Sequence, residues 1–278
     1  MAQAIMDGLR DWIRAAEAVR ATCRNLLEFD ALIQKQRRRY KTKLDGNNMT
    51  NRTAEEARDH YIEKMGQVLG TQFAALWQEV ASVHIKWSEY VALFATNPTR
   101  VEVLNQAAPA FFRMIQDVLW EDTLLHVARL MGSPASFGHK DKANLTLQNL
   151  PDLIANPTTK AKVAESVKAA MAASEFCRDW RKRYIAHRDL KLATDETARP
   201  LEPGSKKQVE DVLDCITKVL NIVDAHFADS ESHFKIGQGP GGAVSLLYDL
   251  DEAQRAKAKR EERLLRGEIS DDDHPRPL

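Results

Sequence analysis

Glycine, proline and cysteine are scarce in this sequence. Its 278 residues include 12 Gly, 10 Pro and 3 Cys. The glycines and prolines concentrate between stretches of periodic hydrophobic residues, which favours long uninterrupted helices over many short strands. The cysteines lie far apart, each within a helical pattern, and they predict buried free thiols in a reducing compartment rather than a disulfide framework. They are Cys23, Cys177 and Cys215.

Long hydrophobic runs are also missing. No window approaches 18 uncharged apolar residues, so we expect no membrane-spanning helix and no membrane partner. The first thirteen residues contain Asp7 and no apolar run, which is unlike a secretory signal peptide. Lys plus Arg and Asp plus Glu number 40 each, so the net charge provides no general attraction to nucleic acid. These features predict a cytoplasmic protein whose affinity for any polyanion depends on local clusters.

The common short motifs for metals, nucleotides and acyl transfer do not occur. There is no His-Glu-x-x-His sequence, no cysteine pair at zinc-finger spacing and no Gly-x-x-x-x-Gly-Lys phosphate loop. The glycine-rich residues 237–242 lack a strand–loop–helix context and are interpreted as a linker. No nucleophile elbow surrounds any serine. We therefore expect neither a metal nor a cofactor.

Hydrophobic residues recur at helical spacing along most of the chain. Capping boxes are predicted at Thr53 with Glu56, at Thr99 with Glu102 and at Ser205 with Gln208. Residues 138–140 are expected in a polar loop and residues 244–250 in a short strand. The third helix is expected to bury Phe111. The predicted helices span residues 4–30, 53–94, 100–131, 145–155, 159–184, 205–226 and 252–266.

This pattern predicts an all-α protein with three parts. An N-terminal helix and basic linker form residues 1–52, a helical bundle forms residues 53–230, and a glycine-rich connector, charged helix and acidic disordered tail form residues 231–278. The basic linker contains Arg37, Arg38 and Arg39. These arginines are candidates for contact with an RNA backbone, and a solvated helix end is the alternative.

Residues 178–189 hold the densest concentration of chemistry. Five cationic side chains and one imidazole fall within twelve residues, Arg-Asp-Trp-Arg-Lys-Arg-Tyr-Ile-Ala-His-Arg-Asp, where a helical pattern ends. RNA cleavage without metal requires a base for the 2′-hydroxyl, stabilisation of phosphoryl charge and an acid for the leaving oxygen. A histidine can serve as base or acid, and arginines can stabilise the phosphate. The alternative is that the cations only complement the dipole of the helix C-terminus.

The spacing Arg181-x5-His187, with Ala186 and Asp189, resembles the Arg-x(4–6)-His signature of HEPN domains, and most closely the AbiU2-like branch. A second stretch, from Phe111-Phe112 through Trp120-Glu121-Asp122 to Ala128-Arg129-Leu130, is similar too, as are residues 144–153. The resemblance covers roughly residues 65–230. It implies a small helical bundle, and many such bundles are metal-independent ribonucleases of toxin–antitoxin, abortive-infection and CRISPR systems.

The resemblance assigns roles within the cluster. His187 corresponds to a general base or acid and Arg181 to a transition-state stabiliser. Lys182 replaces the small polar residue, often Asn, that usually follows the arginine. Glu121 and Arg129 either line the site or form a surface ion pair. The remaining assignments are auxiliary residues Lys182, Arg183, Tyr184 and Asp189, and RNA-binding residues Arg178 and Arg188.

Helix geometry leaves the identity of the working arginine open. In an unbroken helix Arg183, four residues before His187, lies closer to it around the helix than Arg181, six residues before. The resemblance instead favours Arg181. The two agree only if the helix ends or distorts between Tyr184 and His187.

The leading prediction is a metal-independent endoribonuclease. The resemblance implies a toxin or abortive-infection protein that forms a homodimer, with two motifs meeting at one composite site. It also implies RNA as substrate and a possible antitoxin partner. The alternative is a non-catalytic HEPN protein that binds nucleotide or RNA or mediates assembly. A purely structural helical scaffold would leave the basic cluster unexplained.

Overall fold

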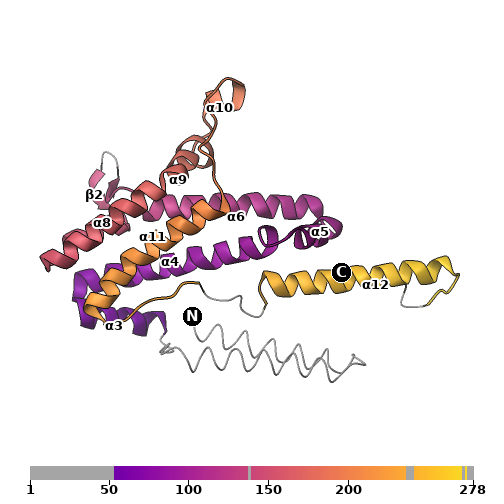
Figure 1. Cartoon of the computed structure of the whole chain (residues 1–278), viewed down its shortest axis with the longest axis horizontal. Coiled ribbons are helices and arrows are strands. Elements are labelled where there is room, and N and C mark those ends of the chain that lie inside the picture. The colour runs from indigo at the N-terminus through magenta and orange to yellow at the C-terminus, as the bar shows by residue number, and fades with distance from the viewer. Residues whose placement is uncertain (1–52, 137–138, 236–240, 271–272, 274–278) are drawn as a thin grey trace.

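The computed structural model describes residues 53–136, 139–235, 241–270 and 273 (Figure 1). The predicted first helix, Cys23 and the basic linker with Arg37, Arg38 and Arg39 lie outside these residues. The described chain is predominantly helical, as predicted for an all-α protein. None of its described helices is both long and apolar enough to cross a membrane.

Two helices replace the single one predicted from Thr53 to residue 94. Helix α3 spans Ala54–Met65, and α4 spans Gln67–Phe94. The predicted capping box at Thr53 and Glu56 is confirmed. The chain turns at Gly66, whose φ of 81° suits glycine. A Cβ on Gly70 would lie 2.4 Å from the Tyr61 carbonyl oxygen, so a glycine there allows close packing of α3 on α4.

The next predicted helix is also divided. Helix α5 spans Pro98–Ala107 and α6 spans Pro109–Leu130. Proline lacks an N–H and disfavours a helical residue before it, which explains the break at Ala108. The capping box predicted at Thr99 and Glu102 is wrong, because Asn97 is the N-cap and accepts a hydrogen bond from the Arg100 N–H at 3.0 Å. The prediction that Phe111 is buried is also wrong, since it is 52% exposed.

A small ribbon follows α6. Strands β1 (Ala135–Ser136) and β2 (His139–Ala143) pair antiparallel, where the sequence predicted a polar loop. Short turns η1 (Leu147–Asn149) and α7 (Leu150–Leu153) occupy the predicted short helix. Helix α8, Pro157–Ala173, begins at Asn156, whose side chain accepts a hydrogen bond from the Thr159 N–H. It ends at Ala173, and the rest of the predicted helix continues beyond Ser174 as two further helical segments.

The remaining helices carry and support the basic cluster. They are α9 (Glu175–Trp180), the π-helix η2 (Arg181–Ile185), α10 (Leu190–Thr194), α11 (Lys206–Phe227) and α12 (Ala243–Leu265). Only half of the capping box predicted at Ser205 forms: Ser205 is the N-cap and its hydroxyl oxygen accepts a hydrogen bond from the Gln208 N–H at 3.2 Å, while the Gln208 Oε1 accepts from the Ser205 hydroxyl at 2.8 Å. The strand predicted for residues 244–250 is wrong. This segment forms the first turns of α12, because Ala243 and Leu247, one turn apart, are buried with Leu104 and Phe112.

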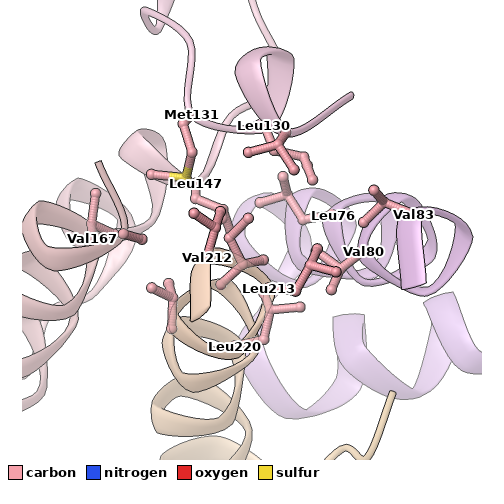
Figure 2. Packing of buried hydrophobic residues seen from close by; sticks show 14 of the residues in the cluster. Leu76, Val80, Val83, Leu130, Met131, Leu147, Val167, Val212, Leu213 and Leu220 are labelled. Carbon is pink, nitrogen blue, oxygen red and sulfur yellow. The ribbon is translucent and has the colours of Figure 1, made fainter. Parts of the chain in front are cut away.

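The main hydrophobic core lies among α4, α6, α8 and α11 (Figure 2). The buried face of α11 repeats every three or four residues, as the sequence predicted. Burying these side chains supplies the main driving force for folding, at roughly 1.5–3 kcal/mol for each large aliphatic residue. The residues of α11 that belong to the hydrophobic core are Val209, Val212, Leu213, Ile216, Val219, Leu220 and Val223. The core fixes the position of α6, on which α9 and η2 pack.

Candidate functional site

The predicted Arg-x5-His segment begins in a widened helical turn. The N–H of Ala186 donates to the Arg181 carbonyl at 2.9 Å, five residues back instead of four. Such π-turns are rare in proteins, and those that occur are often located at functional sites. The helical hydrogen bonding then stops, and His187 lies in the bend beyond it. The helix therefore ends between Tyr184 and His187, which is the interruption that the resemblance requires if Arg181 is the motif arginine.

Arg183 is tied into the fold. Its side chain is only 15% exposed, and its Nη1 and Nε lie 3.5 Å from carboxylate oxygens of Asp179 and Asp189. Nη1 also donates to the Pro200 carbonyl at 3.0 Å, and Nη2 donates to the Arg199 carbonyl at 2.5 Å. These contacts engage most of the guanidinium with the chain itself. Arg183 thus fastens the segment after α10 to the π-turn.

Asp189 closes the segment on its other side. Its Oδ1 accepts hydrogen bonds from the N–H groups of Lys191 and Leu192, at 2.9 and 3.2 Å, and caps α10. The Leu192 N–H and the Arg183 guanidinium lower the pKa of this carboxyl below its usual value. The segment between the helices predicted at residues 159–184 and 205–226 therefore contains a short helix whose N-cap is Asp189.

Three members of the cluster are exposed and have neither a polar nor a ring partner among the described residues. Arg181, Lys182 and His187 are exposed. Among the residues that the structure describes, none of the three has a side-chain hydrogen bond or ion pair. The structure thus separates the cluster into cations held by the fold and cations that face solvent.

An aromatic row supports the cluster from the bundle side. The Tyr184 ring packs edge-on against Trp180, with centroids 5.6 Å apart, and Trp180 packs edge-on against Trp120 of α6 at 6.1 Å. The Trp180 indole N–H donates to the Glu202 carbonyl at 2.8 Å. On the outer side, the Arg188 guanidinium lies 4.2 Å from the Tyr184 ring centroid. The row links the exposed segment to the core.

Sequence reasoning missed Asp179 and Glu202. The Asp179 carboxylate faces Arg183 and also accepts a hydrogen bond from the Glu202 N–H at 3.0 Å. The spacing of Asp179 and Arg183, four residues apart on a helix, is a signal for an ion pair. No local signal indicates Glu202, because it contacts the side chains of Asp179 and Trp180 through its own backbone N–H and carbonyl, and both residues lie more than twenty positions earlier in the chain.

Other candidates are less engaged with this site. Arg178 forms an i,i+3 ion pair with Glu175 on α9. Arg129 is exposed and Glu121 is half-buried. Neither forms an ion pair with the other or with the cluster in the described residues. Cys177 is buried, which raises its thiol pKa to about 12 and leaves it in the unreactive protonated form. In the described parts of the chain, no group of three or more His, Cys, Asp or Glu side chains is placed to hold a metal.

The fold is consistent with an all-α bundle of the HEPN type. A family model described as AbiU2, of the HEPN class, matches residues 67–240. The match covers more than half of the chain and runs from the start of α4 past the end of α11, so it includes residues 178–189. The chain therefore belongs to the HEPN AbiU2 family. No curated protein and no solved structure matches the chain.

Proposed function

We propose that this protein is a metal-independent endoribonuclease of the HEPN type that acts as a toxin or abortive-infection component, with Arg181 and His187 at its active site. The observation that carries the proposal is the different engagement of the two arginines. Arg183 is bound to carboxylates and carbonyls of the fold, whereas Arg181 is exposed at the start of the π-turn without a polar partner in the described residues. A transition-state phosphoryl group needs a cation whose donors are unoccupied.

The chemistry has two proton transfers. His187, in its neutral form, takes the proton from the attacking 2′-hydroxyl, and the oxygen then attacks the adjacent phosphorus. Arg181 stabilises the charge that develops on the non-bridging oxygens. A protonated group gives a proton to the departing 5′-oxygen, and the upstream fragment ends in a 2′,3′-cyclic phosphate. Lys182 contributes further positive charge at the scissile phosphate.

The second proton-transfer group comes, in this proposal, from a second copy of the chain. Residues 178–189 hold one imidazole, whereas concerted acid–base cleavage uses two groups. A homodimer that sets two copies of residues 178–189 side by side across a two-fold axis would supply that group. The exposed apolar residues Phe111, Met114 and Val118 of α6 lie on the side of that helix away from Trp120, which contacts Trp180, so they do not form this interface.

The deciding experiment incubates the purified protein with end-labelled total RNA in excess EDTA. Cleavage with 2′,3′-cyclic ends supports the proposal, and 5′-phosphate products or complete loss of cleavage with chelator contradict it. His187→Ala should abolish cleavage with unchanged helicity. His226→Ala is the matched control, because His226 is an exposed histidine on α11 outside the cluster. RNA binding without cleavage would instead support a non-catalytic RNA-binding protein.

The dimer has its own test. Light scattering should give twice the 31.4 kDa mass of one chain. Mixing Arg181→Ala protein with His187→Ala protein should restore part of the activity if the two motifs share one site. If the protein is a monomer that cleaves RNA at full rate, the composite site is contradicted, whereas the proposed roles of Arg181 and His187 within one chain are not.

A further inference from the structure

Arg188 differs from the other arginines of the cluster in what it contacts. Arg178 pairs with the carboxylate of Glu175. Arg183 lies against the carboxylates of Asp179 and Asp189. Arg188 is exposed and forms no ion pair with a described residue. Its guanidinium instead lies over the Tyr184 ring, 4.2 Å from the centroid.

The ring beneath Arg188 is held in place. Tyr184 contacts Trp180 at an interplanar angle of 67°, and Trp180 contacts Trp120 at 76°. The hydrogen bond from the Trp180 indole N–H to the Glu202 carbonyl fixes the Trp180 ring, on which Tyr184 packs. A platform that is already ordered loses little conformational entropy when a ligand binds. The ordered Tyr184 ring and the Arg188 guanidinium over it therefore form a cation–π pair at the surface, next in sequence to the exposed His187.

We propose that Arg188 and Tyr184 form a binding site for one RNA nucleobase, next to the phosphate that is cleaved. The base stacks on the outer face of the Arg188 guanidinium, and the Tyr184 ring supports the inner face. Arginine planes and aromatic rings are common stacking partners of single-stranded RNA bases. The site is next to the scissile bond because Arg188 directly follows His187, and this part of the inference rests on the proposed function.

The position of the Arg188 guanidinium over an aromatic ring favours a base over a phosphate as its ligand. The five N–H donors of a guanidinium lie in its plane, so a phosphate binds at the edge, whereas the flat faces accept π systems. Lysine keeps the charge of arginine and lacks the plane. Replacement of Arg188 by lysine therefore separates stacking from simple attraction to phosphate.

The test uses His187→Ala protein, which keeps RNA intact, and a short oligouridylate with a single 2-aminopurine base. Stacking of this base quenches its fluorescence. We expect quenching with His187→Ala alone, and its loss on adding Arg188→Lys or Arg188→Ala. Affinity should fall about tenfold, roughly 1.4 kcal/mol, within the usual range for one stacked base. Lys191→Ala is the control, because Lys191 is an exposed cation three residues away, outside the stack.

A second measurement uses wild-type protein and an RNA substrate with an abasic nucleotide at each position around the cleavage site. At one position, loss of the base should lower kcat/KM about tenfold, and Arg188→Ala should cause no further loss with that substrate. Equal quenching by the lysine variant and wild-type-like cleavage of every abasic substrate would overturn the base site. That result would leave the ribonuclease proposal intact. Quenching that depends on Arg188, in a protein that cleaves no RNA, would refute the ribonuclease and retain the base site.

Discussion

Arg183 and Asp179 face each other one helical turn apart, with Nη1 3.5 Å from Oδ2 and both side chains about 15% exposed. Both residues also hold the returning chain. Arg183 binds the carbonyls of Arg199 and Pro200, and Asp179 accepts the Glu202 N–H. The pair is thus the joint between the helix that carries the proposed active site and the segment that leads to α11.

Removal of one partner should destabilise this joint. We predict that Asp179→Ala lowers the free energy of unfolding by about 1–3 kcal/mol, because it leaves the Glu202 N–H without its acceptor and removes one of the two carboxylates that face the largely buried Arg183 guanidinium. For a chain of this size each kcal/mol corresponds to roughly 2–4 °C in Tm. Calorimetry measures the change. Lys207→Ala, which breaks the exposed Lys207–Asp211 pair, should change stability by less than about 1 kcal/mol. Equal effects of the two substitutions would contradict the role of the joint.

Alanine substitutions of Arg181 and of Arg183 should have different effects on turnover and on Tm. Arg181→Ala should lower cleavage turnover at least about tenfold more than Arg183→Ala, a difference of roughly 1.4 kcal/mol in transition-state energy, when each is normalised to folded protein. Arg183→Ala should lower Tm by several degrees, whereas Arg181→Ala should leave Tm unchanged because its side chain is exposed. Turnover and melting curves of both variants check this. A larger loss of turnover at Arg183 would show that the catalytic arginine is Arg183.

Stability should depend on pH through His84. This histidine is 6% exposed, its Nε2 lies 3.1 Å from the Thr217 hydroxyl, and its ring stacks on Phe234. Burial lowers the pKa of His84 from 6.5 to about 4, and Lys235 adds to this while Asp214 opposes it. The folded state favours neutral His84. Its contribution is therefore complete above pH 6.5, declines as the pH falls toward about 4, and is absent below that.

We predict that His84→Gln flattens the fall in Tm between pH 6.5 and pH 4. Part of the dependence should remain, because burial also lowers the pKa of His126. Melting curves across this range provide the measurement, with His226→Ala as the exposed control. An unchanged slope in the glutamine variant would show that His84 does not carry the dependence.

A methyl group at residue 70 should disturb the α3–α4 hairpin. Gly70→Ala places a Cβ 2.4 Å from the Tyr61 carbonyl oxygen and 2.6 Å from the Ile62 backbone, so the helices must separate. The intrinsic gain in helix propensity, about 1 kcal/mol, does not offset that overlap. Thermal unfolding should show a net loss of stability. A stabilised variant would mean that α3 moves away from α4 without cost.

Local chemistry accounts for the features that were predictable. The caps at Thr53 and Ser205 and the buried face of α11 follow from hydrogen-bonding groups and apolar spacing a few residues apart. The resemblance placed the chain in its family from the segment around Arg181 and His187. The glycine at Gly66 and the proline at Pro109 are sequence signals for a helix break. The periodic apolar residues continue on both sides of each, so the sequence pattern predicted unbroken helices.

Tertiary structure decided which residues of the cluster are available. By charge alone, Arg181 and Arg183 are equivalent cations two positions apart. They differ because the carbonyls of Arg199 and Pro200 return to Arg183, and no local pattern specifies that return. Residues 244–250 likewise form a helix instead of a strand because their apolar positions meet α5 and α6. Spacing along the chain determines caps and helical faces, whereas contacts between distant segments determine which charged groups are neutralised and which remain free to bind.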